Sequence, residues 1–260
     1  MIEWCGYKWD SSLEGGRLIH TSFPWQWYSE KCSTVDSEGN LHLKIMKSHR
    51  QIRYSDGTLY SSDYGVGTLR TREKFDYGTF SCEMKMPKGL NLSASFWLSG
   101  DSSWPPEIDI EEGWSEDGNW LHDRTEYFPW IFKSWRTTNN VVFLDKKGDK
   151  ESKTHAGSKN ILLMQQPLDP TENFIEYSCV WKPDSITFYA NGKKVRKICG
   201  KIAKKLIENN ENPGHLMRVI LNIWMENPAE KEVRMDSELV VRNFKYTPLD
   251  NKKTTVNDES

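Results

Sequence analysis

The sequence predicts an all-β protein in which two antiparallel sheets pack face to face as a sandwich or jelly roll. One observation is the alternation of apolar and polar residues with a period of two, which recurs along the chain. Turn-forming Gly, Asn and Pro residues separate these alternating runs. Helical periodicity is nearly absent, because only residues 200–210 (GKIAKKLIENN) are typical of a helix.

The predicted strands follow one another in chain order. The clearest is 80–86 (FSCEMKM), in which every second residue is apolar and Ser, Glu and Lys stand between. Comparable runs occur at 41–45 (LHLKI), 185–190 (SITFYA), 218–224 (RVILNIW) and 239–246 (LVVRNFKY). The Asn-Gly pair at 191–192 directly follows one of these runs and predicts a β-hairpin.

Composition restricts the class of protein. The chain has 260 residues, with 35 basic and 37 acidic side chains, and its net charge of -2 lacks the basic excess of a nucleic-acid binder. It contains no apolar stretch of about 18 residues, so a transmembrane helix is not expected. The 12 tryptophans exceed what a core of this size needs and favour a surface that stacks on flat apolar faces.

The cysteines predict neither a metal site nor a redox pair. Five occur, at 5, 32, 82, 179 and 199, and none lie close enough to form a Cys-x-x-Cys motif. Their odd number leaves at least one thiol free. Cys82 and Cys179 stand within strand-like segments and are interpreted as small buried hydrophobic residues.

No repeat or low-complexity linker divides the chain. We therefore expect a single domain over residues 1–248, followed by a polar tail at 249–260. Residues 114–140 fit neither strand nor helix periodicity and are rich in tryptophan, so we expect a long aromatic loop there. The N-terminus has no signal-peptide pattern, so the protein is either not secreted or has lost a signal peptide.

The most informative segment is 104–114 (WPPEIDIEEGW). Its carboxylates at 107, 109 and 111 alternate with two isoleucines, which on a regular strand places all three carboxylates on one face. A solvated edge strand is one interpretation, although such faces usually mix in Lys or Thr. A pair of glycosidase carboxylates is the functional interpretation. A metal site is a weaker alternative, since the strand carries no His.

The pattern Glu-Ile-Asp-Ile-x-Glu resembles the active-site strand of glycoside hydrolase family 16, the retaining endo-β-glycanases with a concanavalin- or lectin-like jelly-roll fold. Further segments resemble the family in the expected order, so that the likeness extends over residues 37–248. They are 75–89 (FDYGTFSCEMKMPKG), 96–98 (FWL), 177–192 (YSCVWKPDSITFYANG) and 217–222 (MRVILN).

The family contains two registers of this motif, and the sequence satisfies both. A plain strand would make Glu111 the second catalytic carboxylate, whereas a β-bulge would select Glu112. We favour the bulge. In the plain pattern the residue after the acid is usually large and apolar, but in this chain that residue would be Glu112. The resemblance then implies Glu107 as nucleophile, Glu112 as acid and base, and Asp109 as the residue that steadies Glu107. The side chain of Glu111 would then point away from the cleft and be partly solvated or paired with a basic neighbour.

Aromatic side chains suit the apolar faces of sugar rings, while polar groups give specificity. Trp104, three residues before Glu107, and Trp97, on the preceding predicted strand, are the first candidates, and Trp181 is interpreted as core. Trp25 and Trp130 are further candidates. Arginines at 70, 72, 124 and 136 could contact sulfate or acidic sugars. The predicted substrate-binding set is Trp27, Trp97, Trp104, Trp114, Trp135 and Arg136.

The resemblance implies an endo-acting retaining hydrolase that cleaves internal β-linkages of a polysaccharide. The segment Ser93–Trp97 (SASFW) looks closer to galactan-cleaving members, and Val142 stands where many members carry His. The substrate is therefore expected to be a β-galactan of agar, porphyran or carrageenan type, or a β-glucan. A non-catalytic carbohydrate-binding protein and a transglycosylase are the alternatives.

The remaining expectations concern cofactors, partners and location. No cofactor is expected, although many relatives carry a structural calcium ion, for which the sequence identifies no ligands. The resemblance implies a monomer whose partner is a polysaccharide or oligosaccharide, with no nucleic acid and no membrane. A secreted, cell-surface or periplasmic location would suit such a substrate.

Overall fold

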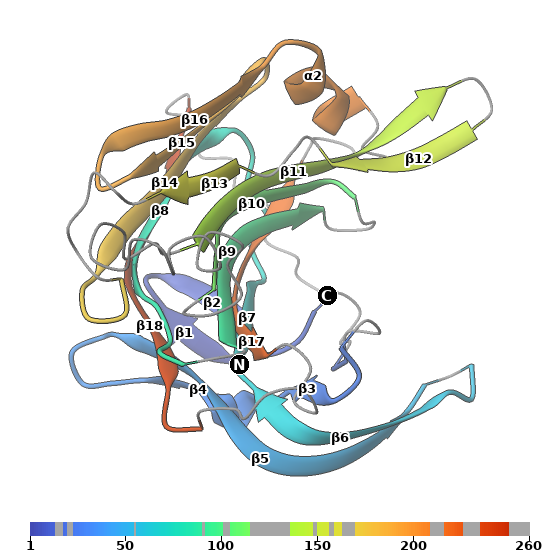
Figure 1. Cartoon of the computed structure of the whole chain (residues 1–260), viewed down its shortest axis with the longest axis vertical. Helices are drawn as coiled ribbons and strands as arrows, with labels where there is room; N and C mark the ends of the chain where they lie inside the picture. The colour runs from blue at the N-terminus through green and yellow to red at the C-terminus, as the bar shows by residue number, and fades with distance from the viewer. Residues whose placement is uncertain are drawn as a thin grey trace, which may run out of the picture.

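The computed structural model describes residues 1–13, 18–19, 23–54, 56–89, 92–100, 105–114, 136–147, 150–155, 159–162, 170–208, 216–225 and 235–249. Two sheets of strongly curved strands enclose a hydrophobic core (Figure 1). Described strands pair antiparallel throughout, except for β3 and β6, which are parallel. The predicted all-β sandwich is confirmed.

The front sheet carries the acidic segment at 107–114 as one of its inner strands. Its order is β1 (Ile2–Trp4), β2 (Tyr7–Asp10), β7 (Thr68–Thr71), β17 (Met217–Met225), β9 (Leu92–Gly100), β10 (Glu107–Trp114), β11 (Arg136–Lys147) and β12 (Lys150–His155), with β13 (Lys159–Leu162) also paired to β11. The acidic strand β10 is thus held on both sides, by β9 and by β11.

The back sheet contains most of the strands predicted from alternation. Its order is β16 (Lys193–Cys199), β15 (Ser185–Ala190), β14 (Ile175–Lys182), β8 (Gly78–Lys85), β18 (Glu238–Pro248), β5 (Leu41–Arg53), β6 (Leu59–Val66) and β3 (Gln26–Tyr28), with β4 (Ser33–Val35) paired to β5. A short 3-10 helix, η2 (Glu30–Cys32), precedes β4, and α2 (Lys201–Glu208) is the helix that the sequence predicts.

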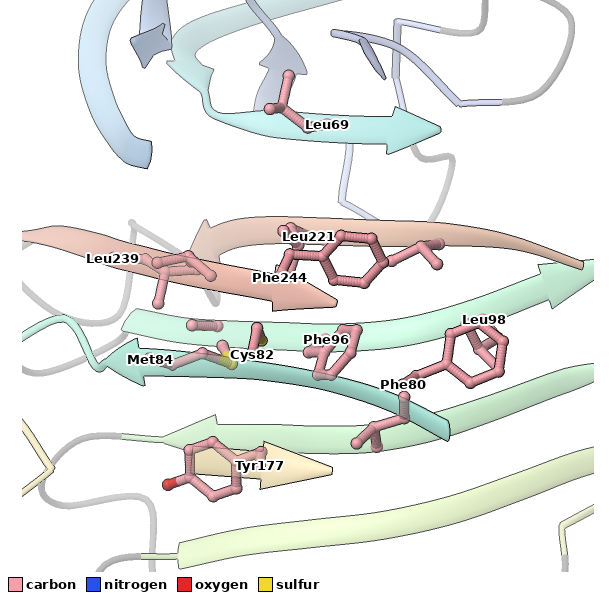
Figure 2. Close-up of a cluster of buried hydrophobic side chains, with 14 of the residues drawn as sticks. Leu69, Phe80, Cys82, Met84, Phe96, Leu98, Tyr177, Leu221, Leu239 and Phe244 are labelled. Carbon is pink, nitrogen blue, oxygen red and sulfur yellow. The ribbon is translucent and has the colours of Figure 1, made fainter. Parts of the chain in front are cut away.

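The core lies between the sheets and is built by strand alternation. On β8 every second residue is buried, and Figure 2 shows Phe80 and Cys82 of this strand beside Phe96 and Leu98 of the front sheet. Burying a side chain of this size contributes about 1.5–3 kcal/mol relative to leaving it exposed. The predicted burial of Cys82 and Cys179 is confirmed, and Trp181 is completely buried.

The hairpin predicted at Asn191 and Gly192 is also present, between β15 and β16. Both residues have positive φ, 45° and 71°, as a type I′ turn requires. The expected loop at 114–140 is wrong at its ends, because residues 136–140 begin β11 and Trp114 ends β10. Residues 115–135 and the predicted tail from 250 onward lie outside the described part of the chain. None of the described helices is long and apolar enough to cross a membrane.

Candidate active site

The three predicted catalytic residues share the outer face of the front sheet, the face that points away from the core. Glu107, Asp109 and Glu112 lie opposite three alternate residues of β9, namely Ser99, Trp97 and Ser95. Directly paired residues of antiparallel strands point to the same side, and alternate residues of one strand share a face. The register therefore brings the two glutamates and the aspartate together in one row along β10.

A β-bulge in β10 produces this arrangement. Between Asp109 and Glu111 the pairing advances by two residues on β10 but by only one on β9, so Ile110 is the additional residue. The register to β11 shifts over the same interval. A bulge reverses the alternation beyond it and re-aims the following side chains. The predicted bulge is confirmed, and Glu112 occupies an outer-face position.

Glu111 does not lie where the sequence placed it. It was expected to be partly solvated or paired with a basic neighbour, but it is 0% exposed and belongs to the interior. Its partner on β9 is Phe96, a core residue. The reason is geometric: when the bulge turns residue 112 outward, residue 111 must turn inward.

Gly113 explains why the chain adopts the bulged register. Gly113 faces the core, where an added Cβ would overlap Met86 Cε and lie 3.0 Å from Glu111 Oε1. In a regular strand the inward position opposite Ala94 would be occupied by Glu112, whose side chain is far larger than the missing Cβ. Gly113 is therefore the sequence signal that favours the bulged register.

Replacing Gly113 by Ala should destabilise the protein by about 1 kcal/mol, the low end of the cost of overpacking, because the flexible end of the Met86 side chain has to move aside. Thermal unfolding followed by circular dichroism measures this change. Ser81→Ala, on the outer face of β8, is the control and should have little effect. An unchanged melting temperature for Gly113→Ala would contradict the inward placement of Gly113.

Burial separates the three carboxylates into two kinds. Asp109 is only 4% exposed, whereas Glu107 and Glu112 are partly exposed. Trp97, paired with Asp109, donates a hydrogen bond from Nε1 to Asn222 Oδ1 at 2.8 Å, which fixes its ring beside the row. A reacting molecule can therefore approach both glutamates, while the enclosed aspartate is suited to orienting them.

Two tryptophan positions, 114 and 224, fall in one cross-strand line beyond Glu112, and we call this line the aromatic row. Cross-strand pairing aligns Trp224 of β17 with Ser93, and Ser93 with Trp114, which is paired in turn with Arg136 of β11. The predicted substrate-binding positions 97, 114 and 136 are thus all on the outer face of the front sheet. Positions 114 and 136 lie beyond the Glu112 end of the carboxylate row, whereas Trp97 is paired with Asp109 at its middle.

Trp224 and Phe23 were missed by the sequence analysis. Their ring centroids are 4.9 Å apart, and Phe23 also contacts Trp25 edge-on at 5.7 Å. Trp25 donates from Nε1 to the carbonyl of Met225 at 3.2 Å, which ties this cluster to the end of β17. Period-two alternation within RVILNIW already placed Trp224 with Asn222 on one face, and that signal could have identified it.

The other predicted binding residues are not brought to this face. Trp27 lies on β3 of the back sheet, is 8% exposed, and donates from Nε1 to the carbonyl of Ser48 at 2.8 Å. The Arg50 guanidinium covers its ring at 4.6 Å, so Trp27 packs between strands of the back sheet. Trp104 and Trp135 lie outside the described residues.

The basic residues near the site have structural contacts. Arg72 makes a bidentate ion pair with Asp10, with its closest hydrogen bonds at 2.9 Å. Arg218 is 7% exposed and donates to the carbonyls of Thr71 and Arg72. Val142, noted in the sequence as a departure from the family, pairs directly with Glu107. Among the described residues, no group of three His, Cys, Asp or Glu is arranged to hold a metal ion.

Several known proteins are similar to this chain in sequence. A β-glucanase from Brevibacillus brevis is 25% identical over 203 residues, covering 76% of this chain but 59% of that protein. β-Porphyranase B from Zobellia galactanivorans is 28% identical over 148 residues, covering 52% of this chain and 45% of that protein. The chain thus spans about half the length of these relatives.

A solved structure shares the fold at low sequence identity. The kappa-carrageenase from Pseudoalteromonas carrageenovora superposes with a TM-score of 0.64 at 15% identity, covering 92% of this chain and 89% of that one. The sequence profile of the glycosyl hydrolases of family 16 matches residues 19–239, which include the whole carboxylate row. The chain therefore belongs to glycosyl hydrolase family 16.

Proposed function

We propose that this protein is an endo-acting, retaining glycoside hydrolase that cleaves internal β-linkages of a polysaccharide. The observation that carries the proposal is the row of Glu107, Asp109 and Glu112 on one face of β10, created by the bulge. Two accessible carboxylates with an enclosed one between them suit double displacement at a glycosidic bond. Family membership supports the same reaction class.

In the first step Glu107 attacks the anomeric carbon, while Glu112 donates its proton to the departing glycosidic oxygen. This step leaves a covalent glycosyl-enzyme ester on Glu107 and a free sugar hydroxyl on the leaving chain. In the second step the Glu112 carboxylate removes a proton from water, which attacks the same carbon and releases Glu107. Inversion at each step gives net retention of configuration.

The geometry of β10 supports this division of roles. Retaining enzymes need their carboxyl groups about 5–5.5 Å apart. Glu107 and Glu112 lie opposite Ser99 and Ser95, and residues four positions apart on a flat strand are separated by about 13 Å. The strands of the front sheet are strongly curved (Figure 1), and curvature of this kind lets side chains on one face converge. Asp109, between the two glutamates and nearly buried, would accept or share a proton with Glu107 and hold its orientation.

The substrate class is proposed from the outer face and from the relatives. Proteins similar to this chain are named as a β-glucanase, a β-porphyranase and a kappa-carrageenase, which act on different β-linked chains. A screen of laminarin, mixed-linkage glucan, agarose, porphyran and carrageenan for new reducing ends tests the proposal. No reducing ends on any of these polymers, despite binding, would instead favour a carbohydrate-binding protein. Product sizing at high oligosaccharide concentration separates hydrolysis from transglycosylation.

The aromatic row is proposed as a platform for a sugar ring beside Glu112. Replacing Trp224 by Ala should raise KM for the polysaccharide about 3- to 10-fold, because a stacked aromatic contributes about 0.5–1.5 kcal/mol beyond its buried area. Trp224→Phe should recover much of the affinity. Tyr189→Ala, on β15 of the back sheet, is the control. Equal KM values for Trp224→Ala and the unmodified protein would remove Trp224 from the binding surface.

The mechanism uses only carboxylates and water, so we propose that catalysis needs no cofactor. Activity should then survive prolonged treatment with a chelator. A fall in melting temperature under chelation, at constant activity, would indicate a structural calcium ion. Because a polysaccharide is too large to enter a cell intact, we also propose that the protein acts outside the cytoplasm. We further propose that it acts as a monomer.

A further inference from the structure

A cavity of about 550 Å³ lies apart from the carboxylate row, where an edge of the front sheet meets an edge of the back sheet. Its walls come mainly from the end of β2, from β3 with the adjoining η2, and from the middle of β5. Pockets that hold small ligands typically measure about 300–1,000 Å³. The cavity is therefore large enough to take part of a glycan.

One wall of the cavity is an arginine stacked on a tryptophan. Trp27 is held rigidly, because its indole is 8% exposed and its Nε1 donates to the Ser48 carbonyl at 2.8 Å. The guanidinium of Arg50 lies 4.6 Å from the centre of this ring. Stacking uses the flat face of a guanidinium and leaves the N–H groups at its edge available. No described residue accepts a hydrogen bond from the Arg50 guanidinium or forms an ion pair with it.

The charges around the cavity favour a negatively charged ligand. Lys31 is a second cation in the wall, and it too has no carboxylate partner among the described residues. Of the two acidic residues in the wall, Asp10 is already neutralised by Arg72, with hydrogen bonds at 2.9 Å. Glu30 remains as one carboxylate against the two cations Lys31 and Arg50. The wall therefore carries an excess of positive charge.

Cross-strand pairing connects the cavity with the carboxylate row. Asp10, which lines the cavity, pairs with Arg70 of β7. The line then passes through Ile220 and Trp97 to Asp109. Directly paired residues point to the same side, so this line follows the outer face of the front sheet. Its two ends are four strand spacings of about 4.8 Å apart, or roughly 19 Å along the sheet.

The direction of a bound glycan follows from the proposed function, on which this step rests. In a retaining hydrolase the two carboxyl groups flank the glycosidic bond that is cleaved. Glu107 and Glu112 lie one after the other along β10. A glycan that passes between them must therefore cross the strands of the front sheet instead of running along β10. One end of such a chain points toward β2 and the cavity.

We propose that this cavity is a distal binding site for an anionic group of the glycan, either a sulfate ester or a carboxylate, held by Arg50 and Lys31. A guanidinium suits both anions, because its N–H groups can form two parallel hydrogen bonds to a pair of oxygens. The site would recognise a sugar unit remote from the cleaved bond. Only a chain long enough to span both places would use it.

Binding is tested by calorimetry in a Glu107→Gln background, which keeps the ligand intact. The probes are sulfated oligosaccharides of carrageenan and porphyran, a β-linked oligoglucuronate that carries carboxylates, and a neutral laminarin oligosaccharide. Adding Arg50→Gln should weaken binding of a charged probe about tenfold, because charge-assisted hydrogen bonds are strong. It should leave the affinity for the neutral probe unchanged. The charged probes that respond identify the anion as sulfate or carboxylate.

Two matched variants and a change of salt sharpen this test. Arg50→Lys keeps the charge without the planar fork, so its affinity should fall between those of Arg50 and Arg50→Gln. Arg53→Gln removes an exposed arginine of the same strand that does not line the cavity, and it should bind every probe as Arg53 does. The difference caused by Arg50→Gln should also shrink at high ionic strength.

Kinetics separate a distal site from a general loss of structure. In otherwise unmodified protein, Arg50→Gln should raise KM for the anionic polysaccharide and leave kcat unchanged. A short aryl glycoside cannot reach the cavity, so its kcat and KM should both stay the same. Equal effects on the long and the short substrate would show a structural role for Arg50 and overturn the proposed site.

The outcomes also distinguish this inference from the proposed function. If no charged probe binds, or if Arg50→Gln and Arg53→Gln bind the charged probes equally well, the cavity is not an anion site, even where hydrolysis is confirmed. If binding of a charged probe depends on Arg50 but no polysaccharide is cleaved by the unmodified protein, the proposed function fails and the anion site stands.

Discussion

Replacing Glu107 by Gln is expected to abolish turnover of the polysaccharide while leaving the fold intact. The amide has the same shape as the carboxylate but is too weak a nucleophile to form the glycosyl-enzyme ester. Removing a covalent nucleophile typically costs about four orders of magnitude or more in kcat. Glu107 is partly exposed on the outer face, so the substitution leaves no gap in the core.

The measurement is the rate of release of reducing ends, alongside circular dichroism and binding of the intact polymer. The variant should still bind substrate, since the aromatic row is unchanged. Asp63→Asn removes an exposed carboxylate of the back sheet that pairs with His49, and it serves as the control with ordinary activity. A Glu107→Gln protein that turns over at the ordinary rate would show that Glu107 is not the nucleophile.

Much of the sandwich could be predicted, because a strand that is buried on one face has an apolar residue at every second position. The run at 185–190 coincides with β15, and 218–224 lies within β17. By contrast, β11 begins with Arg-Thr-Thr-Asn-Asn, which carries no alternation, and it forms because β10 offers a paired edge. Strands as short as β1 and β7, with 3 and 4 residues, are too short to show an alternation.

The site was predictable where the motif was local and not where it depended on partners in space. Glu107, Asp109 and Glu112 came from one strand, and a single bulge places them together. Trp27 and Trp224 are distinguished only by the sheet to which each belongs, which no local pattern reveals. The burial of Glu111 follows from the same bulge, because a bulge that turns residue 112 outward turns residue 111 inward.

Replacing Glu112 by Gln should have an effect that depends on the leaving group. On a natural glycan the first step lacks its proton donor, and general acid catalysis contributes about 10²–10⁴-fold. In an aryl glycoside with an acidic phenol, the phenolate leaves without being protonated. The first step on such a substrate should therefore be nearly unaffected by Glu112→Gln. The second step then lacks its base, so the glycosyl-enzyme should accumulate and appear as a burst of released phenol.

Two further measurements identify Glu112 as the group that is lost. Azide, an anionic nucleophile that needs no base, should restore turnover of the aryl glycoside in Glu112→Gln and produce a glycosyl azide. The alkaline limb of the pH profile, where the acid loses its proton, should disappear for the activated substrate. The comparison with Glu111→Gln is decisive because the two residues are adjacent and chemically identical, yet the bulge sends one outward and the other into the core. If Glu111→Gln instead shows the burst and the azide rescue while Glu112→Gln does not, the strand is regular in solution and Glu111 is the acid.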